Sequence, residues 1–320
     1  MSKKVIVTGV AGFIGSHLCE ALLDDGFDVV GIDCFTSNYD VRIKKHNISR
    51  CLENTNFTLI EESLNTLDFT ELVEGTDYVF HQAAQPGVRD SWQKKFDEYV
   101  DSNIRATHRL CEAFRGHNLK RLVYAGSSSV YGETAELPMS ESHPTRPLSP
   151  YGVTKLAGEA LCLLYKQNYG LPVISLRYFT VFGPRQRADM AFHKFIKNAL
   201  HGQPIEIYGS GTQTRDFTFV SDIVDANLRA MDYGGDESVF NIGGGARITL
   251  NSVLDLLLDA LPGETDVRYC DTIKGDVSHT YADITLARDQ LGYAPKANLE
   301  ESIHSEVEWI RSLRGTVPGY

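Results

Sequence analysis

A tyrosine and a lysine four residues apart are the residues of this chain best suited to chemistry on an alcohol. Tyr151 and Lys155 stand at positions i and i+4 of a stretch with helical spacing, so both side chains lie on one face of the expected helix. An unperturbed tyrosine has a pKa of ~10 and is a weak base at neutral pH, but a neighbouring ammonium favours the phenolate and lowers that pKa. Tyr151 can then take a proton from a substrate hydroxyl while Ser127 holds the same oxygen. Because Tyr-x-x-x-Lys also occurs by chance on helix surfaces, its meaning depends on the surrounding sequence.

Three glycines near the N-terminus supply that context. Gly9, Gly12 and Gly15 directly follow an apolar run and open a stretch with helical spacing. In a nucleotide-binding turn the first glycine permits a tight bend, the second lets the backbone approach a pyrophosphate, and the third lets the helix pack against the strand. Asp33 ends the second apolar run, close to the expected offset of ~20 residues, where a carboxylate accepts hydrogen bonds from ribose hydroxyls and repels a 2′-phosphate. The pattern predicts NAD binding and, with Tyr151, hydride transfer between a nicotinamide and an alcohol.

Short apolar runs alternate with helically spaced segments over the first half of the chain. This alternation predicts an α/β fold, a doubly wound parallel sheet of the Rossmann type with helices on both faces. The expected strands are 5–8, 29–32, 58–60, 78–81, 121–125 and 173–177, and the expected helices include 13–23, 99–115, 151–168 and 251–261. We expect an NAD-binding domain over 1–178, to which 217–247 partly return, and a smaller C-terminal α/β lobe over 179–320 that binds substrate.

The composition argues against several classes of protein. The formal net charge is −11 and the pI about 5.4, which is a poor match to nucleic acid or to an anionic membrane surface. The six cysteines show no Cys-x-x-Cys pair and no metal-ligand spacing, and no apolar run approaches the length of a membrane span. We expect a cytoplasmic protein with free thiols and no metal. The basic run 42–46 is expected to be a solvated helix face.

Further motifs extend the pattern along the chain. They are His-Gln-Ala-Ala at 81–84, Ser-Ser-Ser-Val-Tyr-Gly at 127–132, Arg-Tyr-Phe-Thr at 177–180, Arg-Asp-Phe at 215–217 and Gly-Asp-Val at 275–277. With the glycine turn and the Tyr-Lys pair, they resemble the extended short-chain dehydrogenase/reductase family, the NAD-dependent nucleotide-sugar epimerases and dehydratases. The resemblance runs nearly from end to end. It implies tightly held NAD, a UDP-sugar substrate, and a homodimer built through helices 99–115 and 151–168.

The resemblance also implies roles for individual residues. Ser127, Tyr151 and Lys155 form the catalytic triad. The NAD site takes Gly9, Gly12, Phe13, Ile14, Gly15, Asp33, Gln82, Ala83, Ala84, Asn103 and Tyr178, with Tyr151 and Lys155. Ser63, beside Leu64, stands where relatives usually have an adenine-capping Asp, and its hydroxyl bonds the adenine more weakly. Arg215 grips the nucleotide diphosphate, Asp276 contacts the uridine ribose, and Lys274 stands near where relatives often have Arg, without the bidentate fork of a guanidinium.

Two serines discriminate among the reactions of this family. Dehydratases carry Asp and Glu where this chain has Ser128 and Ser129, and decarboxylases usually keep a Glu at the position of Ser129. An epimerase needs neither acid, because the same hydride returns to the opposite face of the ketone. Segments 86–92 and 182–190 most resemble UDP-glucuronate 4-epimerases. We therefore expect UDP-glucuronate to become UDP-galacturonate by transient oxidation at C4 to a 4-keto intermediate.

The sugar contacts follow from the same resemblance. Thr180 replaces the Asn of galactose-type enzymes, and Ser128, Ser129 and Thr180 can donate hydrogen bonds to a C6 carboxylate. Arg185 or Arg187 supplies charge to that carboxylate or to the diphosphate, with Arg89 a weaker candidate; for each arginine a surface charge or an ion pair is the alternative. Other open readings are a 4-epimerase of UDP-glucose or UDP-N-acetylhexosamine, a UDP-glucuronate decarboxylase, and a non-catalytic dinucleotide-sensing protein. The last class typically loses the Tyr or the Lys, and this chain retains both.

Overall fold

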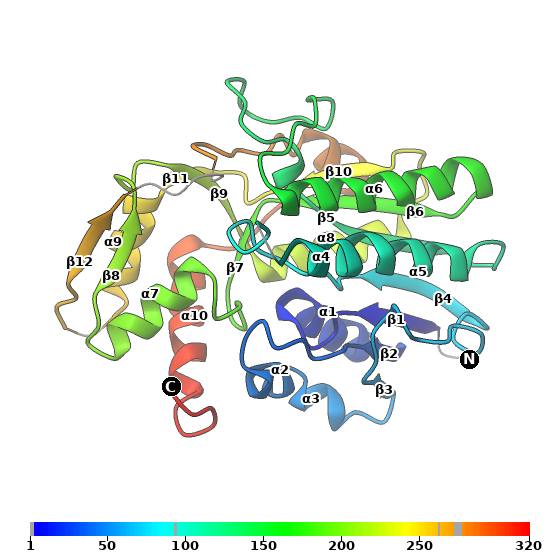
Figure 1. Ribbon diagram of the computed structural model, residues 1–320, viewed down its shortest axis with the longest axis horizontal. Coiled ribbons are helices and arrows are strands. Elements are labelled where there is room, and N and C mark those ends of the chain that lie inside the picture. Colours follow the sequence, from blue (N-terminus) through cyan, green and yellow to red (C-terminus); the bar gives the residue numbers. More distant parts are fainter. Residues whose placement is uncertain (1–2, 93–94, 262, 272–276) are drawn as a thin grey trace.

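The computed structural model describes residues 3–92, 95–261, 263–271 and 277–320 (Figure 1), so Lys274 and Asp276 lie outside the described residues. A seven-stranded sheet of order β10-β6-β5-β4-β1-β2-β3 forms its centre, and all neighbouring strands run parallel. The strands are β1 (Lys4–Thr8), β2 (Asp28–Ile32), β3 (Phe57–Ile60), β4 (Thr76–His81), β5 (Arg121–Ser127), β6 (Val173–Tyr178) and β10 (Val239–Ile242). The six expected strands and the doubly wound parallel fold are confirmed.

Two hydrophobic cores, one on each face, explain why the strands read as continuous apolar runs. In β1, Val5 and Val7 face one core and Ile6 faces the other, and all three side chains are buried. The first core is closed by α1 (Phe13–Asp24) and α8 (Val220–Asp232), and the second by α5 (Ala106–Phe114) and α6 (Pro150–Tyr169). In Figure 1, α5 and α6 run along the sheet in front of β4, β5 and β6.

The strand order reverses at the centre of the sheet. From β1 the chain moves through β2 to β3 on one side, and then through β4, β5 and β6 on the other. In open α/β sheets the crevice at the carboxyl ends of strands flanking such a reversal is where ligands bind. The carboxyl ends of β1, β2 and β4 carry the glycine turn, Asp33 and Gln82, so the topology brings three predicted cofactor residues together.

A smaller group of elements lies at the left of Figure 1, beyond the carboxyl ends of these strands. It contains a three-stranded sheet of β11 (Arg247–Thr249), β9 (Thr214–Phe219) and β7 (Thr180–Phe182), and the parallel pair β8 (Ile205–Tyr208) and β12 (Val267–Cys270). The helices α7 (Ala191–Leu200), α9 (Leu250–Asp259) and α10 (Leu299–Ser312) pack with these strands around a third core. Within 217–247, β10 joins the large sheet and α8 packs in its first core, where Ala287, Leu291 and Tyr293 also pack.

Two local expectations differ from the structure. The expected helix 99–115 is divided into α4 (Phe96–Tyr99), a π-helical turn (Val100–Arg105) and α5, so its residues do not keep one regular helical register. The basic run 42–46 lies mostly on α2 (Val41–Asn47), followed by α3 (Ser49–Leu52), and the expectation of a solvated face is wrong for Lys44, which is 5% exposed. Its ammonium donates to the Thr36 carbonyl and hydroxyl, at 2.7 and 2.9 Å.

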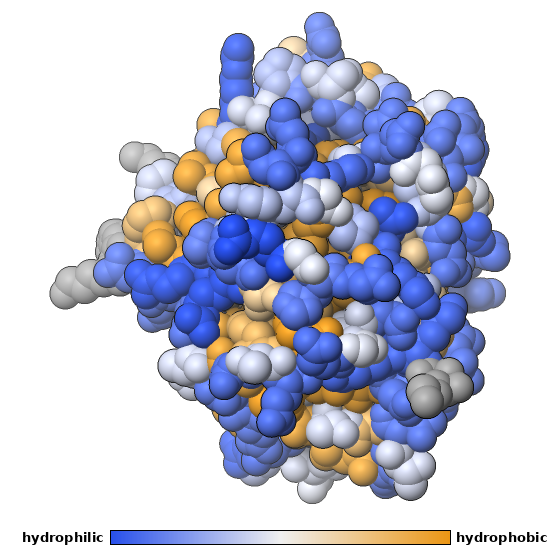
Figure 2. Space-filling model, turned by 90° about the vertical axis from the view of Figure 1, so that its right-hand side faces the viewer, coloured by the Kyte–Doolittle hydropathy of each residue, from blue (hydrophilic) through white to orange (hydrophobic). Residues whose placement is uncertain are grey.

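The surface seen in Figure 2, the right-hand end of Figure 1, is mostly hydrophilic, with apolar side chains in separate small patches. Within the described ranges no helix combines the length and the apolar character that crossing a bilayer requires. The same part of the chain contains no group of three or more His, Cys, Asp or Glu side chains placed to hold a metal ion.

Candidate active site

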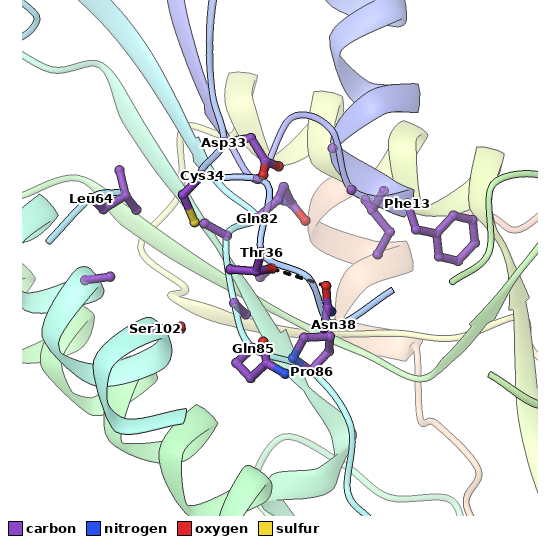
Figure 3. A pocket seen from close by; sticks show the side chains of 18 of the residues that line it. Phe13, Asp33, Cys34, Thr36, Asn38, Leu64, Gln82, Gln85, Pro86 and Ser102 are labelled. Atoms are coloured by element: carbon purple, nitrogen blue, oxygen red, sulfur yellow. Dashed lines mark hydrogen bonds between the residues drawn. The ribbon is translucent and has the colours of Figure 1, made fainter. Parts of the chain in front are cut away.

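Two clefts meet at the start of α6. The first runs over the carboxyl ends of β1, β2 and β4, and part of its lining is seen in Figure 3. Its walls include these predicted cofactor residues: Gly9, Gly12, Phe13, Ile14, Gly15, Asp33, Ser63, Leu64, Gln82, Ala83, Ala84, Tyr151, Lys155 and Tyr178. Four residues of its wall that the sequence does not predict for the cofactor site follow β2: Thr36, Asn38, Tyr39 and Lys44, the last of which is expected only in the solvated basic run. Their position just after Asp33, at the same end of the sheet, is the signal that marks them.

The glycine turn leaves room for backbone alone. Gly9 has φ +69°, and a Cβ there would lie 2.7 Å from the Ala83 nitrogen. A Cβ on Gly15 would lie 2.2 Å from the Gly9 carbonyl oxygen. The turn therefore packs α1 directly on the ends of β1 and β4 and presents the N-terminus of α1 to the cleft, which is the cradle that a dinucleotide pyrophosphate fits.

Asp33 and Tyr178 mark two other parts of this cleft. The Asp33 carboxylate accepts from the backbone nitrogens of Ala11 (3.1 Å) and Phe35 (2.8 Å), and burial raises its pKa. Since each carboxylate oxygen has two lone pairs, acceptor capacity remains for ribose hydroxyls. The Tyr178 hydroxyl accepts from Gln82 Nε2 at 3.1 Å.

Asn103 is the one predicted cofactor residue that does not line this cleft. Its side chain accepts from the Gln85 nitrogen (2.7 Å) and donates to the Gln85 carbonyl (3.0 Å) and to Thr154 Oγ1 (3.0 Å). Gln85 does line the cleft, and Thr154 is on α6. The buried Asn103 amide thus joins the cofactor loop to α6, because its hydrogen bonds go to Gln85 and Thr154.

Helix α6 begins where it does because of two residues. Ser149 caps its N-terminus by accepting from the Gly152 nitrogen at 3.1 Å, and Pro150 occupies the first turn, where a missing N–H has no cost. Tyr151 and Lys155 consequently fall in the first two turns and point toward the cleft. A Cβ on Gly152 would lie 2.6 Å from the Ser129 carbonyl, so the helix start packs tightly on the segment that follows Ser127.

Electrostatics around Tyr151 differ from the expectation. Burial raises the pKa of Tyr151, while a hydrogen bond from Ser127 and the charge of Arg187 lower it. The lowering expected from Lys155 is not found; the cation that acts on the phenol is Arg187. Burial lowers the pKa of Lys155 to about 8, and its ammonium lies 4.5 Å from the centre of the Tyr124 ring. Phenol and ammonium are thus both weakly solvated, which makes their protonation sensitive to any charge that enters the cleft.

The second cleft shares several residues with the first, among them Phe13, Tyr151, Tyr178 and Arg187, and extends into the smaller lobe. Its walls include these predicted residues: Arg89, Ser127, Ser128, Ser129, Thr180, Arg187 and Arg215. Those that the sequence did not single out are mostly on the smaller lobe: Lys194, Asn198, Tyr208 and Gln213 among them. The Arg89 guanidinium stacks 4.7 Å from the centre of the Tyr208 ring, and this contact joins the two lobes across the cleft.

The two neighbouring arginines have opposite placements. Arg187 lines both clefts and makes a two-point contact with Asp189, at 3.0 and 2.7 Å. Arg185 is not part of either lining, and its guanidinium pairs with Glu20 on α1 at 2.7 Å. The structure therefore does not bring Arg185 to the predicted sugar site, because its side chain leaves the segment on the side of α1.

A buried carboxyl supports the same segment from behind. Glu306 on α10 accepts from the Gly183 nitrogen at 2.9 Å, it is fully buried, and its Oε1 has no hydrogen-bond partner among the described residues. Burial raises the pKa of Glu306 well above its usual value of 4.5. Because the folded pKa exceeds the unfolded one, its contribution to stability is complete below pH 4.5 and is lost as the pH rises.

We expect Glu306→Gln to remove this pH dependence. The difference in free energy of unfolding between variant and wild type should grow in the variant's favour as the pH rises above 4.5, by at most about 1.4 kcal/mol per pH unit. Urea unfolding at several pH values measures it. Glu301→Gln, an exposed position on the same helix, is the matched control and should give a difference that is constant with pH. A constant difference for Glu306→Gln as well would show that burial does not raise the pKa of this carboxyl.

Comparison with known proteins identifies the family. The profile described as "NAD dependent epimerase/dehydratase family" matches residues 5–243. YtcB of Bacillus subtilis (strain 168), described as an uncharacterized UDP-glucose epimerase, is 45% identical over 313 residues, 97% of this chain and 98% of that protein. A UDP-glucuronate 4-epimerase of Thermodesulfobacterium geofontis (strain OPF15) is 36% identical over 310 residues, 96% of this chain and 95% of that protein. The crystal structure of UDP-glucuronic acid 4-epimerase from Bacillus cereus with UDP-glucuronic acid and NAD has a TM-score of 0.93 at 41% identity, over 97% of this chain and 99% of that chain. This chain belongs to the NAD-dependent epimerase/dehydratase family.

Proposed function

We propose that the protein is an NAD-dependent 4-epimerase of UDP-sugars that interconverts UDP-glucuronate and UDP-galacturonate. The observation that carries this proposal is Tyr151 at the junction of a dinucleotide-shaped cleft and a second cleft rimmed by Ser128, Ser129 and Thr180. The activities printed for the Thermodesulfobacterium and Bacillus cereus relatives support the same reaction.

The roles follow from the placement of each side chain. Bound NAD would accept the hydride from C4 of the sugar, and its positive nicotinamide ring would favour the Tyr151 phenolate. Tyr151 takes the proton of the O4 hydroxyl and later returns it, Ser127 holds that oxygen by a hydrogen bond, and Lys155 keeps a positive charge near the site. The glycine turn and Asp33 hold the dinucleotide, and Arg215 holds the sugar diphosphate.

A C6 carboxylate sets a second task for the site. The 4-keto form of a uronate is a β-keto acid, which loses CO₂ when the C5–C6 bond stands perpendicular to the ketone plane. Hydroxyl groups of Ser128, Ser129 and Thr180 can hold the carboxylate so that this bond stays near the plane, and Arg187 balances its charge. None of these three hydroxyls is an acid strong enough to protonate a leaving group, which favours epimerisation over dehydration.

The test is product analysis by NMR with UDP-glucuronate, UDP-glucose and UDP-N-acetylglucosamine. We expect UDP-galacturonate from the first at a kcat/KM at least about 10-fold above the others. With a neutral sugar, the groups that bind the carboxylate would be left without a partner. Thr180→Val should lower that kcat/KM about 10-fold and release some CO₂ and pentose. Equal turnover of UDP-glucose would favour the UDP-glucose epimerase suggested by the printed name of YtcB, and a pentose product from the unaltered protein would favour the decarboxylase.

We also propose that the protein is a homodimer formed through α5 and α6. Val153 and Leu164 on α6 are 48% and 52% exposed, and they lie about three turns apart on one face of the helix. Light scattering should give twice the chain mass of 35.6 kDa. Leu164→Glu should shift the protein to the mass of one chain, because burying an unpaired carboxylate against an apolar patch costs free energy. A monomeric unaltered protein would contradict the dimer.

The cytoplasmic location expected from the cysteine content stays a prediction.

A further inference from the structure

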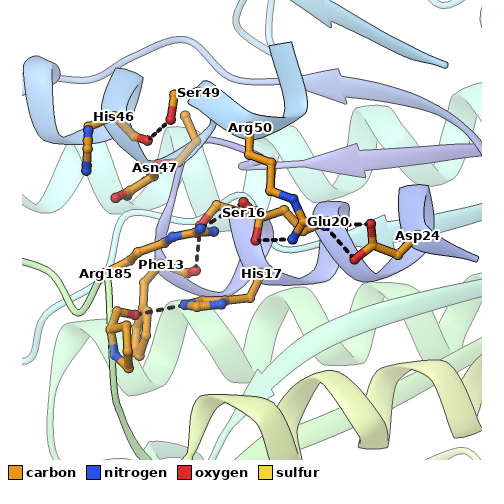
Figure 4. Close-up of polar contacts among 12 residues, drawn as sticks. Phe13, Ser16, His17, Glu20, Asp24, His46, Asn47, Ser49, Arg50 and Arg185 are labelled. Atoms are coloured by element: carbon orange, nitrogen blue, oxygen red, sulfur yellow. Dashed lines mark hydrogen bonds and ion pairs between the residues drawn. The ribbon is translucent and has the colours of Figure 1, made fainter. Parts of the chain in front are cut away.

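The segment 183–190, between β7 and α7, carries the arginine that reaches both clefts. Arg187 lines both clefts, as Tyr151 does. Arg185, two residues earlier, lines neither cleft and points toward Glu20 on α1 (Figure 4). A regular strand would place both side chains on the same side, because side chains in a strand alternate with a period of two. Something in the segment therefore separates the directions of the two arginines.

The backbone of Arg185 provides that separation. Its φ is +68°, and Phe35 is the other non-glycine residue with a positive φ in the described part of the chain. A residue with a side chain avoids this left-handed region unless surrounding contacts hold it there. The left-handed conformation at Arg185 is therefore a feature that the contacts of the segment must maintain.

Those contacts come from the helix that opens the cofactor cleft. The Arg185 guanidinium pairs with Glu20 at 2.7 Å, and His17 Nε2 lies 2.8 Å from the Pro184 carbonyl oxygen. Because a carbonyl can only accept, Nε2 carries the hydrogen and donates it. Burial, with the nearby charge of Arg185, lowers the pKa of His17 to about 4, so the ring stays neutral in this contact. Both anchors are on α1, the helix whose N-terminus lines the cofactor cleft.

The ion pair is shielded from solvent. The Arg185 and Glu20 side chains are 17% and 13% exposed, and the second oxygen of Glu20 faces Arg50 at 3.8 Å. Removal of one partner of a partly buried pair destabilises the local structure, since the other charge is left in a poorly solvated place. The pair can thus hold the strained residue in its conformation.

We propose that Arg185 is a positioning residue: together with Glu20 and His17 it fastens segment 183–190 to α1 and thereby holds the Arg187 guanidinium at the sugar site. This inference rests on the proposed function in so far as Arg187 acts on the substrate. It replaces the expected substrate contact of Arg185 with an indirect role, and it couples the sugar cleft to the cofactor-binding helix.

The test is a set of variants read for kcat/KM with UDP-glucuronate, for the fraction of decarboxylated product and for Tm. Arg185→Met keeps the aliphatic stem without the charge, and Glu20→Gln removes the partner while leaving the segment unchanged. Each should lower kcat/KM about 10-fold and raise the decarboxylated fraction, because a small displacement of a binding group has a large effect on rate. Arg185→Lys should restore most of the loss. In an Arg187→Met background neither change should have a further effect, because both act through Arg187.

The proposal would be overturned if Arg185→Met or Glu20→Gln lowered kcat/KM by the same factor with and without Arg187→Met. It would also be overturned if neither change altered the kinetics of the otherwise unaltered protein. If Arg185→Met does not fold, Glu20→Gln alone carries the same comparison. Calorimetric binding of UDP-glucuronate separates this failure from that of the proposed function. An unaltered protein that binds the nucleotide sugar without epimerising it would contradict the function, and the dependence of binding on Arg185 in the two Arg187 backgrounds would still test the positioning role.

Discussion

Tyr151→Phe should lower kcat for UDP-sugar interconversion by about 10³-fold, within the range observed for removal of a general acid–base. The variant loses only the hydroxyl, which is the group placed where the two clefts meet. Among the described tyrosines, Tyr178 also lines both clefts, but its hydroxyl is already bonded to Gln82 and Asn227. Binding of NAD and of UDP-sugar should persist, because neither requires the proton transfer.

The matched control is Tyr169→Phe, at the far end of the same helix, where the side chain is 54% exposed. It should leave kcat unchanged. Rates are measured by NMR of the sugar anomeric protons, and NAD content by absorbance of the denatured protein. If Tyr151→Phe retained a rate within 10-fold of the unaltered protein, Tyr151 would not be the base, and the catalytic interpretation would be wrong.

Gly15→Ala should abolish retention of NAD. The added Cβ would lie 2.2 Å from the Gly9 carbonyl oxygen, 2.9 Å from its carbon and 3.1 Å from the Val10 Cα. These are backbone atoms of the turn, so the turn itself must move, and overpacking of this kind costs about 1–3 kcal/mol of stability. A displaced turn no longer presents the N-terminus of α1 to a pyrophosphate.

Gly234→Ala is the control for this change, since a Cβ there meets no atom within 4 Å. It should retain NAD and leave Tm unchanged. The measurements are the dinucleotide content of the purified protein and thermal unfolding. Full retention of dinucleotide by Gly15→Ala would contradict the assignment of this turn as the phosphate cradle.

How much of the site could be predicted depends on how local each feature is. The spacing of Tyr151 and Lys155 places both side chains on one face of a helix, and the capping serine and proline before them fix where that helix starts. The glycine turn is equally local, because strand, turn and helix follow one another without interruption. The fold class followed from the alternation of such elements, and the structure confirms it.

The surroundings of other residues depend on contacts that the spacing of a regular helix or strand does not describe. Lys44 looked solvated in a basic run, yet it is buried beside Thr36 because the segment after β2 folds over the cofactor cleft. Asn103 is expected at the cofactor, and the structure places its amide between Gln85 and Thr154, on an interrupted helix beside the cleft. Sequence spacing does not report which polar partner a side chain meets when that partner is many residues away.

The sequence by itself determined the parallel sheet, the dinucleotide turn and the Tyr-Lys pair, because each depends on short-range periodicity and backbone conformation. Only the tertiary structure placed Arg187 at the clefts and Arg185 against α1. The two side chains are alike and two residues apart, and their directions are set by a left-handed residue held by Glu20 and His17, about 165 positions earlier in the chain. Side-chain direction in an irregular segment follows from packing and ion pairing across the fold, which are interactions that neighbouring residues in the chain do not encode.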